Sequence, residues 1–184
     1  MNKELKRIAL EKMADDDYAT RANAAVKAVI PFIKKHEKFM PNAYRKMIGM
    51  KDGKPVYDKW TIGYGQTTFN GRAVREGDTI TEPEAAKFVA KRVRENAARL
   101  YRQIPWTRHL SQGALSAAYD TAYNAGPNVF SSVKSPNLNY EMSSADTDWD
   151  RILKRELPTY VRAGGVRLKG LERRRADAIR TFMN

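Results

Sequence analysis

The stretch NAYRKMIGMKDGKPVYDKWTIGYGQT (residues 42–67) carries the clear β signal of the sequence. Asp52-Gly53 favours a two-residue turn, because such a turn needs positive φ and these residue types adopt it readily. β-prone residues flank the turn on both sides. We therefore predict a hairpin whose cross-strand partners have numbers summing to 105, so that Tyr44 faces Thr61 and Lys46 faces Lys59.

Helical patterns surround this hairpin. Residues 2–14 and 19–29 are predicted as two amphipathic helices. Pro31 is expected to open a separate short helix that ends near Lys38, because proline is tolerated at the first helical position. Glu37 would then lie close to the C-terminal end of that helix.

Capping signals mark the helices that follow. Thr81 and Glu84 form a capping-box pattern before a long helix over 82–104. Ser111 is expected to cap a helix over 112–125, which Gly126 can end. Further helices are predicted near 146–156 and 170–182, with loops and one short helix between 127 and 145.

Composition fits one domain, or one domain in two lobes. The chain has 184 residues, of which 42% are hydrophobic and 30% charged, so it can bury a core. We predict an α+β fold that is mostly α, with a small β-hairpin lobe and a larger helical lobe joined by a long helix. No segment is apolar enough for a transmembrane span or a signal peptide, so synthesis in a cytoplasm is expected.

Residue types exclude several kinds of chemistry. The absence of cysteine excludes disulfides and thiolate metal sites. The two histidines, His36 and His109, do not form a His-Glu-x-x-His motif, so no metal and no cofactor are expected.

The net charge of +13 favours an anionic partner. Nucleic acid, an anionic membrane and an anionic wall polymer all fit, as does a surface that is charged only for solubility. A nucleic-acid protein is disfavoured, because basic and aromatic residues are not interleaved on one element and no binding motif occurs.

Several motifs share one order along the chain. Glu37 precedes Ala43-Tyr44 and Thr61-Ile62-Gly63-Tyr64-Gly65, and Tyr123-Asn124-Ala125-Gly126 precedes Gly170-Leu171 with Arg173-Arg174. From about residue 21 onward, this pattern resembles the phage-type lysozymes, glycoside hydrolase family 24. The resemblance implies a lysozyme domain over 21–184, with a β lobe at about 31–80 and a helical lobe at about 81–184, after an N-terminal helical extension over 1–20.

The resemblance also implies a function. An endolysin of this kind hydrolyses the β-1,4 bond between N-acetylmuramic acid and N-acetylglucosamine in peptidoglycan, which lyses the host cell. We expect a monomer that is made in the host cytoplasm and reaches the periplasmic wall after the membrane is permeabilised. Anionic outer-membrane or wall polymers are further expected partners. The extension is expected either to pack on the helical lobe or to contact the outer membrane through Lys3, Lys6, Arg7 and Lys12.

Site residues follow from the same resemblance. Glu37 is the expected catalytic acid, Thr61 is expected to position water, and Arg174 to form an ion pair with Glu37. Expected substrate-positioning residues are Tyr64, Asn124 and Gln66, the last at a position that is histidine in many members. Plain structural roles compete with each: a solvated helix face for Glu37, an ordinary strand position for Thr61, and a solvated basic face for Arg173–Arg175. Lys38 replaces the glycine that usually follows the catalytic glutamate.

The second carboxylate departs from the family pattern. The usual aspartate position is Lys46, within a hairpin that is longer than usual. Asp58 is our candidate, and a bulge would turn it toward Thr61; Pro55 already makes this arm irregular. Asp52 at the hairpin tip is more remote. Two alternatives stay open: cleavage by Glu37 alone, as in lytic transglycosylases, with an anhydro-sugar product, or a wall-binding protein without activity.

Overall fold

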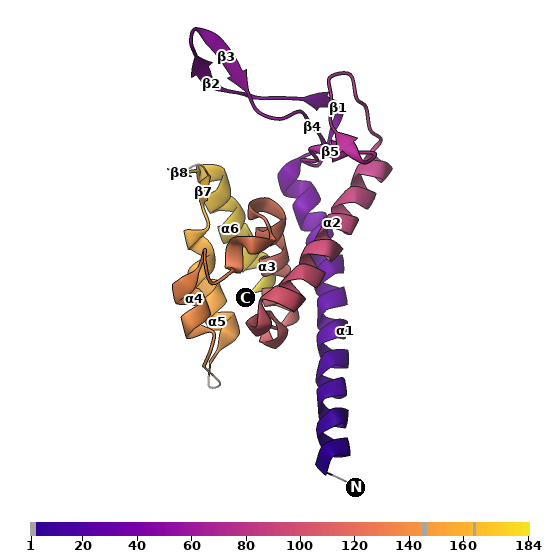
Figure 1. The fold of residues 1–184 in the computed structure, drawn as a ribbon, viewed down its shortest axis with the longest axis vertical. Helices are drawn as coiled ribbons and strands as arrows, with labels where there is room; N and C mark the ends of the chain where they lie inside the picture. The colour runs from indigo at the N-terminus through magenta and orange to yellow at the C-terminus, as the bar shows by residue number, and fades with distance from the viewer. Residues whose placement is uncertain (1–2, 145–146, 164) are drawn as a thin grey trace. The chain divides into compact units, whose positions relative to one another are not determined.

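The computed structural model describes residues 3–144, 147–163 and 165–184, and the chain divides into two compact units (Figure 1). The β unit comprises Ile30–Arg92, and the helical unit comprises Met1–Val29 together with Val93–Asn184. Helices α1 (Lys3–Glu37) and α2 (Glu82–Gln103) each run from one unit into the other. The predicted α+β, mostly α fold is confirmed.

Helix α1 corrects the prediction for the N-terminal region. The two expected helices and the separate helix at Pro31 are one continuous helix with Pro31 inside it. An internal proline costs about 3 kcal/mol, because it removes a hydrogen bond and crowds the preceding turn. Val29 and Ile33 are fully buried on either side of it, so tertiary packing of one apolar face outweighs that cost. The structure describes the backbone of this region but not the basic side chains that we expected to contact the outer membrane, those of Lys3, Lys6, Arg7 and Lys12.

Two antiparallel strand pairs dominate the β unit. Strand β1 (Met40–Tyr44) pairs with β4 (Thr61–Gly63), and β2 (Met47–Lys51) pairs with β3 (Lys54–Tyr57). Smaller pairs are β5 (Thr68–Phe69) with β6 (Arg72–Ala73) here, and β7 (Arg162–Ala163) with β8 (Val166–Arg167) in the helical unit.

The predicted hairpin is confirmed at its tip and at the Tyr44–Thr61 pair, and it is wrong between them. Asp52 and Gly53 have φ of 52° and 73°, as the two-residue turn requires. Tyr44 pairs with Thr61 as predicted, but the expected Lys46–Lys59 pair does not form. The backbone N–H of Asp58 instead donates to Lys46 O at 2.8 Å, because the register shifts in the first arm, between Met47 and Gly49.

The helix caps follow the sequence closely. Glu84 Oε2 accepts hydrogen bonds from the backbone N–H (2.9 Å) and the hydroxyl (2.6 Å) of Thr81, which caps α2. Ser111 caps α3 (Gln112–Ala125) by accepting from the N–H of Ala114, and Gly126 ends it with φ of 89°. The remaining helices are α4 (Pro136–Glu141), α5 (Trp149–Glu156), α6 (Lys169–Phe182) and the short 3₁₀ helices Pro105–His109, Pro127–Phe130 and Leu157–Thr159.

Helix α3 forms the centre of the helical unit. Its residues from Ala114 to Tyr123 are all buried. Gly113 allows the end of α6 to approach, because a Cβ atom there would overlap the carbonyl oxygen of Phe182. The Tyr119 hydroxyl lies 3.3 Å from that of Tyr18, which joins α3 to α1 within this unit.

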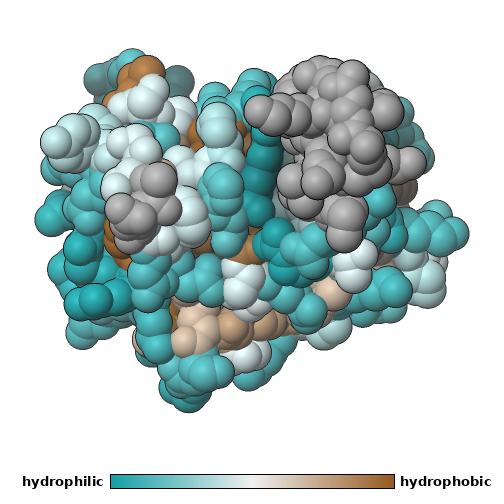
Figure 2. Space-filling model, turned by 90° about the horizontal axis from the view of Figure 1, so that it is seen from below, coloured by the Kyte–Doolittle hydropathy of each residue, from teal (hydrophilic) through white to brown (hydrophobic). Residues whose placement is uncertain are grey.

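The surface is strongly polar. The face drawn in Figure 2 is mostly hydrophilic, in keeping with the net charge of +13. Among the residues that the structure describes, none of the helices combines the length and apolar character that a membrane crossing requires.

Candidate active site

A tight turn lies at the centre of the β unit. The backbone groups of Ile62 and Gln66 exchange two hydrogen bonds of 2.9 Å, which close the turn Gly63-Tyr64-Gly65. Gly63 and Gly65 have φ of 62° and 87°, values that side chains other than glycine's rarely adopt. The Thr-Ile-Gly-Tyr-Gly motif is therefore a backbone device that holds a short loop in one conformation.

Gln66 fastens this turn to helix α2. Its buried Oε1 accepts from the backbone N–H of Tyr64 at 2.6 Å, and its Nε2 donates to Ala85 O at 3.1 Å. A Cβ atom at Gly63 would overlap Gln66 Oε1. The amide is thus engaged by the protein itself, and the substrate-positioning role that we expected for Gln66 stays a prediction.

Tyr64, the middle residue of the turn, has a buried side chain. Its hydroxyl donates to Glu82 Oε1 at 2.7 Å, and Lys34 forms an ion pair with the same oxygen at 2.5 Å. The ring of Phe39 packs against Tyr64 with centroids 5.5 Å apart. Burial raises the pKa of Tyr64, and its hydrogen bond to Glu82 adds to that rise. Tyr64 therefore ties the turn to the ends of α1 and α2.

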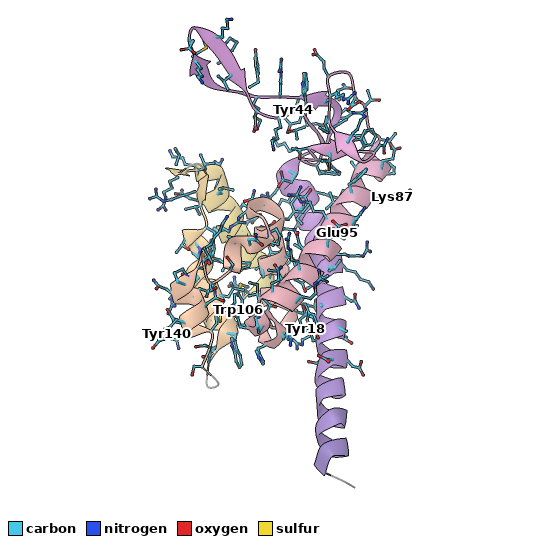
Figure 3. All side chains as sticks on the ribbon, viewed as in Figure 1. Tyr18, Tyr44, Lys87, Glu95, Trp106 and Tyr140 are labelled. Atoms are coloured by element: carbon cyan, nitrogen blue, oxygen red, sulfur yellow. The ribbon has the colours of Figure 1, made fainter. Side chains whose placement is uncertain are left out.

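Glu37 is the last residue of α1 and lies beside the turn. A Cβ atom at Gly65 would lie 3.4 Å from Glu37 Oε2, so the carboxyl group rests against that glycine. Burial raises the pKa of Tyr44, which is labelled in Figure 3, and the negative charge of Glu37 raises that pKa further, so the two side chains interact electrostatically. Lys38 adopts φ of 54°, so it ends the helix in the conformation usually taken by glycine.

Thr61 and Asp58 lie on the segment that enters β4. Thr61 pairs with Tyr44, and its hydroxyl donates to Lys59 O at 3.1 Å. Asp58 is exposed, and its Oδ1 accepts from the backbone N–H of Lys59 at 2.7 Å. Both side chains are thus oriented by the same residue, while the oxygen lone pairs of Thr61 stay available to accept a hydrogen bond.

The loop after β6 braces the first strand. Arg72 donates to both oxygens of Asp78, at 2.8 and 2.7 Å, and the backbone N–H of Arg75 donates to Oδ2 at 2.8 Å. These bonds, foremost that from Arg72, lower the pKa of Asp78 to about 2. The carbonyl of Asp78 in turn accepts from the N–H of Ala43 at 2.9 Å, which holds β1 in place.

The helical unit contains a buried ionic cluster. Arg174 donates to Asp120 at 2.8 and 3.0 Å, and Arg175 donates to the other oxygen of Asp120 at 2.9 Å and to Asn124 Oδ1 at 2.8 Å. Asp120 is fully buried, and both arginines are nearly so. The alternative of a solvated basic face is therefore wrong for Arg174 and Arg175, though Arg173 is exposed. The ion pair of Arg174 with Glu37 stays a prediction.

Sequence reasoning missed Asp120. A carboxylate inside the otherwise uncharged helix 112–125 is a signal for a buried partner, because an isolated buried charge is too costly to keep. Asn124, one turn later, also lines a pocket of about 410 Å³ with Tyr160, Arg162 and Leu168. The structure thus places Asn124 at a hollow in the helical unit.

No metal-binding cluster occurs among the described residues, where groups of three His, Asp or Glu side chains suited to an ion are absent. The β unit offers instead a carboxyl group at a helix end beside a glycine turn, with a threonine hydroxyl nearby on β4. Glycoside cleavage requires a carboxylic acid as proton donor, together with a second carboxylate that activates a water or attacks the sugar.

Comparison with known proteins identifies the class and then the family. The fold resembles that of the endolysin from Escherichia coli O157:H7 phage FAHEc1, with a TM-score of 0.61 and 20% identity over 88% of this chain and 91% of that one. It also resembles the active form of the phage P1 endolysin Lyz (TM-score 0.60, 18% identity, 96% and 92% covered) and the lysozyme of phage P22 (0.57, 19%, 84% and 94%). No curated protein matches the sequence.

The chain belongs to the phage lysozyme family, whose model matches residues 34–178. It is therefore a peptidoglycan-degrading hydrolase of the lysozyme (muramidase) class, as the sequence motifs predicted. This membership does not favour the alternatives of a transglycosylase or of a basic binding protein.

Proposed function

We propose that this lysozyme cleaves the β-1,4 glycosidic bond of peptidoglycan with Glu37 as the general acid. The observation that carries this proposal is the position of Glu37, at the end of α1, with its carboxyl group against Gly65. Glycine leaves the backbone bare there, so a sugar chain can approach the acid closely. Glu37 would donate its proton to the leaving glycosidic oxygen.

Thr61 is the proposed water-positioning residue. Its hydroxyl hydrogen is directed to Lys59 O, so its oxygen can accept a hydrogen bond from the attacking water. Such a water donates one hydrogen to Thr61 and keeps both lone pairs, one of which would attack the anomeric carbon.

Asp58 is the proposed base that receives the water's proton. It is the carboxylate closest in sequence to Thr61, and the backbone of Lys59 orients both side chains. The irregular register that precedes Asp58 frees it from the strict alternation of a hairpin ladder.

Arg174, Asn124, Tyr64 and Gln66 are proposed to position the substrate or the acid. For Tyr64 and Gln66 the role is indirect, because their polar groups hold the Gly63–Gly65 turn. Asp120 would hold Arg174 in one rotamer. We further propose a monomer that is made in the host cytoplasm and acts on the periplasmic wall after membrane permeabilisation, and whose net charge of +13 attracts anionic wall or outer-membrane polymers.

Matched aspartate variants test the mechanism. Asp58→Asn should lower the rate of peptidoglycan hydrolysis at least about 100-fold, the usual contribution of a general base. Asp52→Asn is the control, since it makes the same change at the hairpin tip, where asparagine also adopts positive φ. Mass spectrometry of the released muropeptides should show reducing ends. An Asp58→Asn enzyme with full activity, or anhydro-sugar products, would contradict this mechanism.

A further inference from the structure

The hairpin β2–β3 has a surface that the hydrolytic site does not use. Figure 1 shows it projecting from β1 and β4 at the far side of the β unit. Among the described residues, nine large hydrophobic side chains are exposed, and four of them belong to this hairpin: Met47, Met50, Val56 and Tyr57. Exposed apolar residues are unremarkable when scattered, whereas a cluster of them indicates an interaction surface.

The register gathers most of these side chains on one face. Met50 pairs with Pro55, and Met47 pairs with Tyr57. Pro55 and Tyr57 are two residues apart on β3, so both pairs lie on the same side of the hairpin. Met47, Met50 and Tyr57 are 62%, 63% and 42% exposed, which makes this side an apolar face without a cover.

Basic side chains lie at the tip of the hairpin and beside Tyr57. Lys51 pairs with Lys54 next to the tip, and this pair lies on the other face of the hairpin. The guanidinium of Arg45 lies 4.2 Å from the ring centre of Tyr57, so a cation is held directly beside the apolar face. Residues 45–59 contain five basic and two acidic residues. The hairpin is therefore apolar on one face and positively charged at its tip and base.

We propose that the β2–β3 hairpin binds the surface of an anionic phospholipid bilayer. Met47, Met50 and Tyr57 would enter the boundary between headgroups and acyl chains, where flexible apolar and aromatic side chains are favoured. Arg45, beside Tyr57, would bind the lipid phosphates, and Lys51 and Lys54, on the other face near the tip, would add to the attraction by the anionic surface. Methionine side chains offer a sugar no hydrogen bonds, so the chemistry of this face fits a bilayer better than a glycan strand.

Vesicle binding by the full chain tests this proposal. Wild-type protein should sediment with vesicles of phosphatidylcholine and phosphatidylglycerol, and not with vesicles of phosphatidylcholine alone. The double variants Met47→Ser/Met50→Ser and Lys51→Gln/Lys54→Gln should each weaken sedimentation on the order of tenfold. Val133→Ser/Tyr140→Ser is the matched control, because these side chains are 90% and 83% exposed and belong to the helical unit; Tyr140 is labelled in Figure 3.

The lack of cysteine allows a second, local readout. An environment-sensitive fluorophore on Met50→Cys should shift to the blue with anionic vesicles, and the same label on Val133→Cys should not. Equal shifts at both positions, or hairpin variants that sediment like the wild type, would overturn the proposal. The proposal would also be overturned if the hairpin variants lost binding to purified peptidoglycan but kept binding to vesicles, because the face would then bind a glycan. It would likewise be overturned if the wild-type protein were a dimer and the methionine variants were monomers, because the face would then bind a second copy of the chain. Vesicle binding is measured without turnover, so it stands independently of the hydrolytic mechanism.

Discussion

At the scale of single residues, Gly65 has the most specific role. Gly65 has a φ of 87°, and a Cβ atom at this position would lie 3.4 Å from Glu37 Oε2. The carboxyl group of the proposed acid therefore packs directly against this glycine. Gly65→Ala should lower the rate of peptidoglycan hydrolysis on the order of 100-fold, because the added methyl group would occupy the space through which a sugar approaches the acid.

A matched glycine separates this effect from backbone strain. Gly53→Ala introduces the same residue at a φ of 73°, where no atom lies within 4 Å of the new Cβ. Both variants should lose stability, as thermal unfolding will measure, but only Gly65→Ala should lose activity. Equal rates for the two variants would remove Gly65 from the site.

Lys38 has a strained backbone conformation, at a position where the sequence already departs from the family pattern. It stands where glycine usually follows the acid, and it has the positive φ that glycine would supply. Lys38→Gly should raise the free energy of unfolding by about 0.5–1 kcal/mol, because the left-handed conformation costs lysine that much. Urea denaturation measures the change. Lys27→Gly, inside α1, should instead lower stability by about 1 kcal/mol, and a loss in both variants would refute the argument.

The residues that position Tyr64 and Gln66 were beyond sequence reasoning. Glu82 and Ala85 lie on α2, far along the chain from the turn, and only the packing of the helix beside the turn makes them partners. Gly63 and Gly65 could be found from the sequence, because they belong to one contiguous motif. Their neighbours depend on tertiary geometry.

At the scale of elements, local signals decided most boundaries. The capping pairs of α2 and α3 are formed by neighbours in sequence, so the sequence alone predicts them. Pro31 led to the wrong prediction of a helix boundary, because the cost of proline inside a helix is a local effect. The burial of Val29 and Ile33, which offsets this cost, depends on tertiary packing. The expected Lys46–Lys59 pair was wrong for a similar reason, since a shift in the first arm does not change the turn signal at the tip.

The bracing loop makes the β unit sensitive to acid. The pKa of Asp78 falls from 3.8 to about 2 in the fold, foremost because Arg72 donates to it. A carboxylate with a lowered pKa contributes stability that is present above its ordinary pKa and is lost as the pH falls through about 2. Wild-type protein should therefore unfold at a higher urea concentration than Asp78→Asn at pH 6, and this advantage should vanish between pH 4 and 2. Glu76→Gln is the control, and an advantage that persists at pH 2 would contradict the assignment.

At the scale of the whole molecule, the chain assigns different tasks to its two units. The β unit contains the proposed acid, and the helical unit holds Arg174 and Asn124 through the charges of Asp120 and Arg175. Removing Asp120 alone would take this carboxylate away from two buried guanidinium groups. Its loss should therefore destabilise the fold strongly. The family resemblance predicted Arg174 and Asn124, but it did not predict the carboxylate that orients them.

The net charge of +13 belongs to this scale as well. We expect it to attract the enzyme to anionic surfaces in general, because charges spread over a whole surface act over distances of about a Debye length. Specificity for the glycosidic bond must then arise from the local site, where the proposed proton donor Glu37 lies against Gly65.

The most direct test of this account is the rate at which Glu37→Gln releases reducing ends from purified peptidoglycan. Glutamine keeps the size of the side chain and has no proton to donate, so we expect the rate to fall at least about 1,000-fold while the protein still sediments with the wall and unfolds at the wild-type temperature. A folded Glu37→Gln protein that hydrolyses peptidoglycan at the wild-type rate would contradict the central role of this residue.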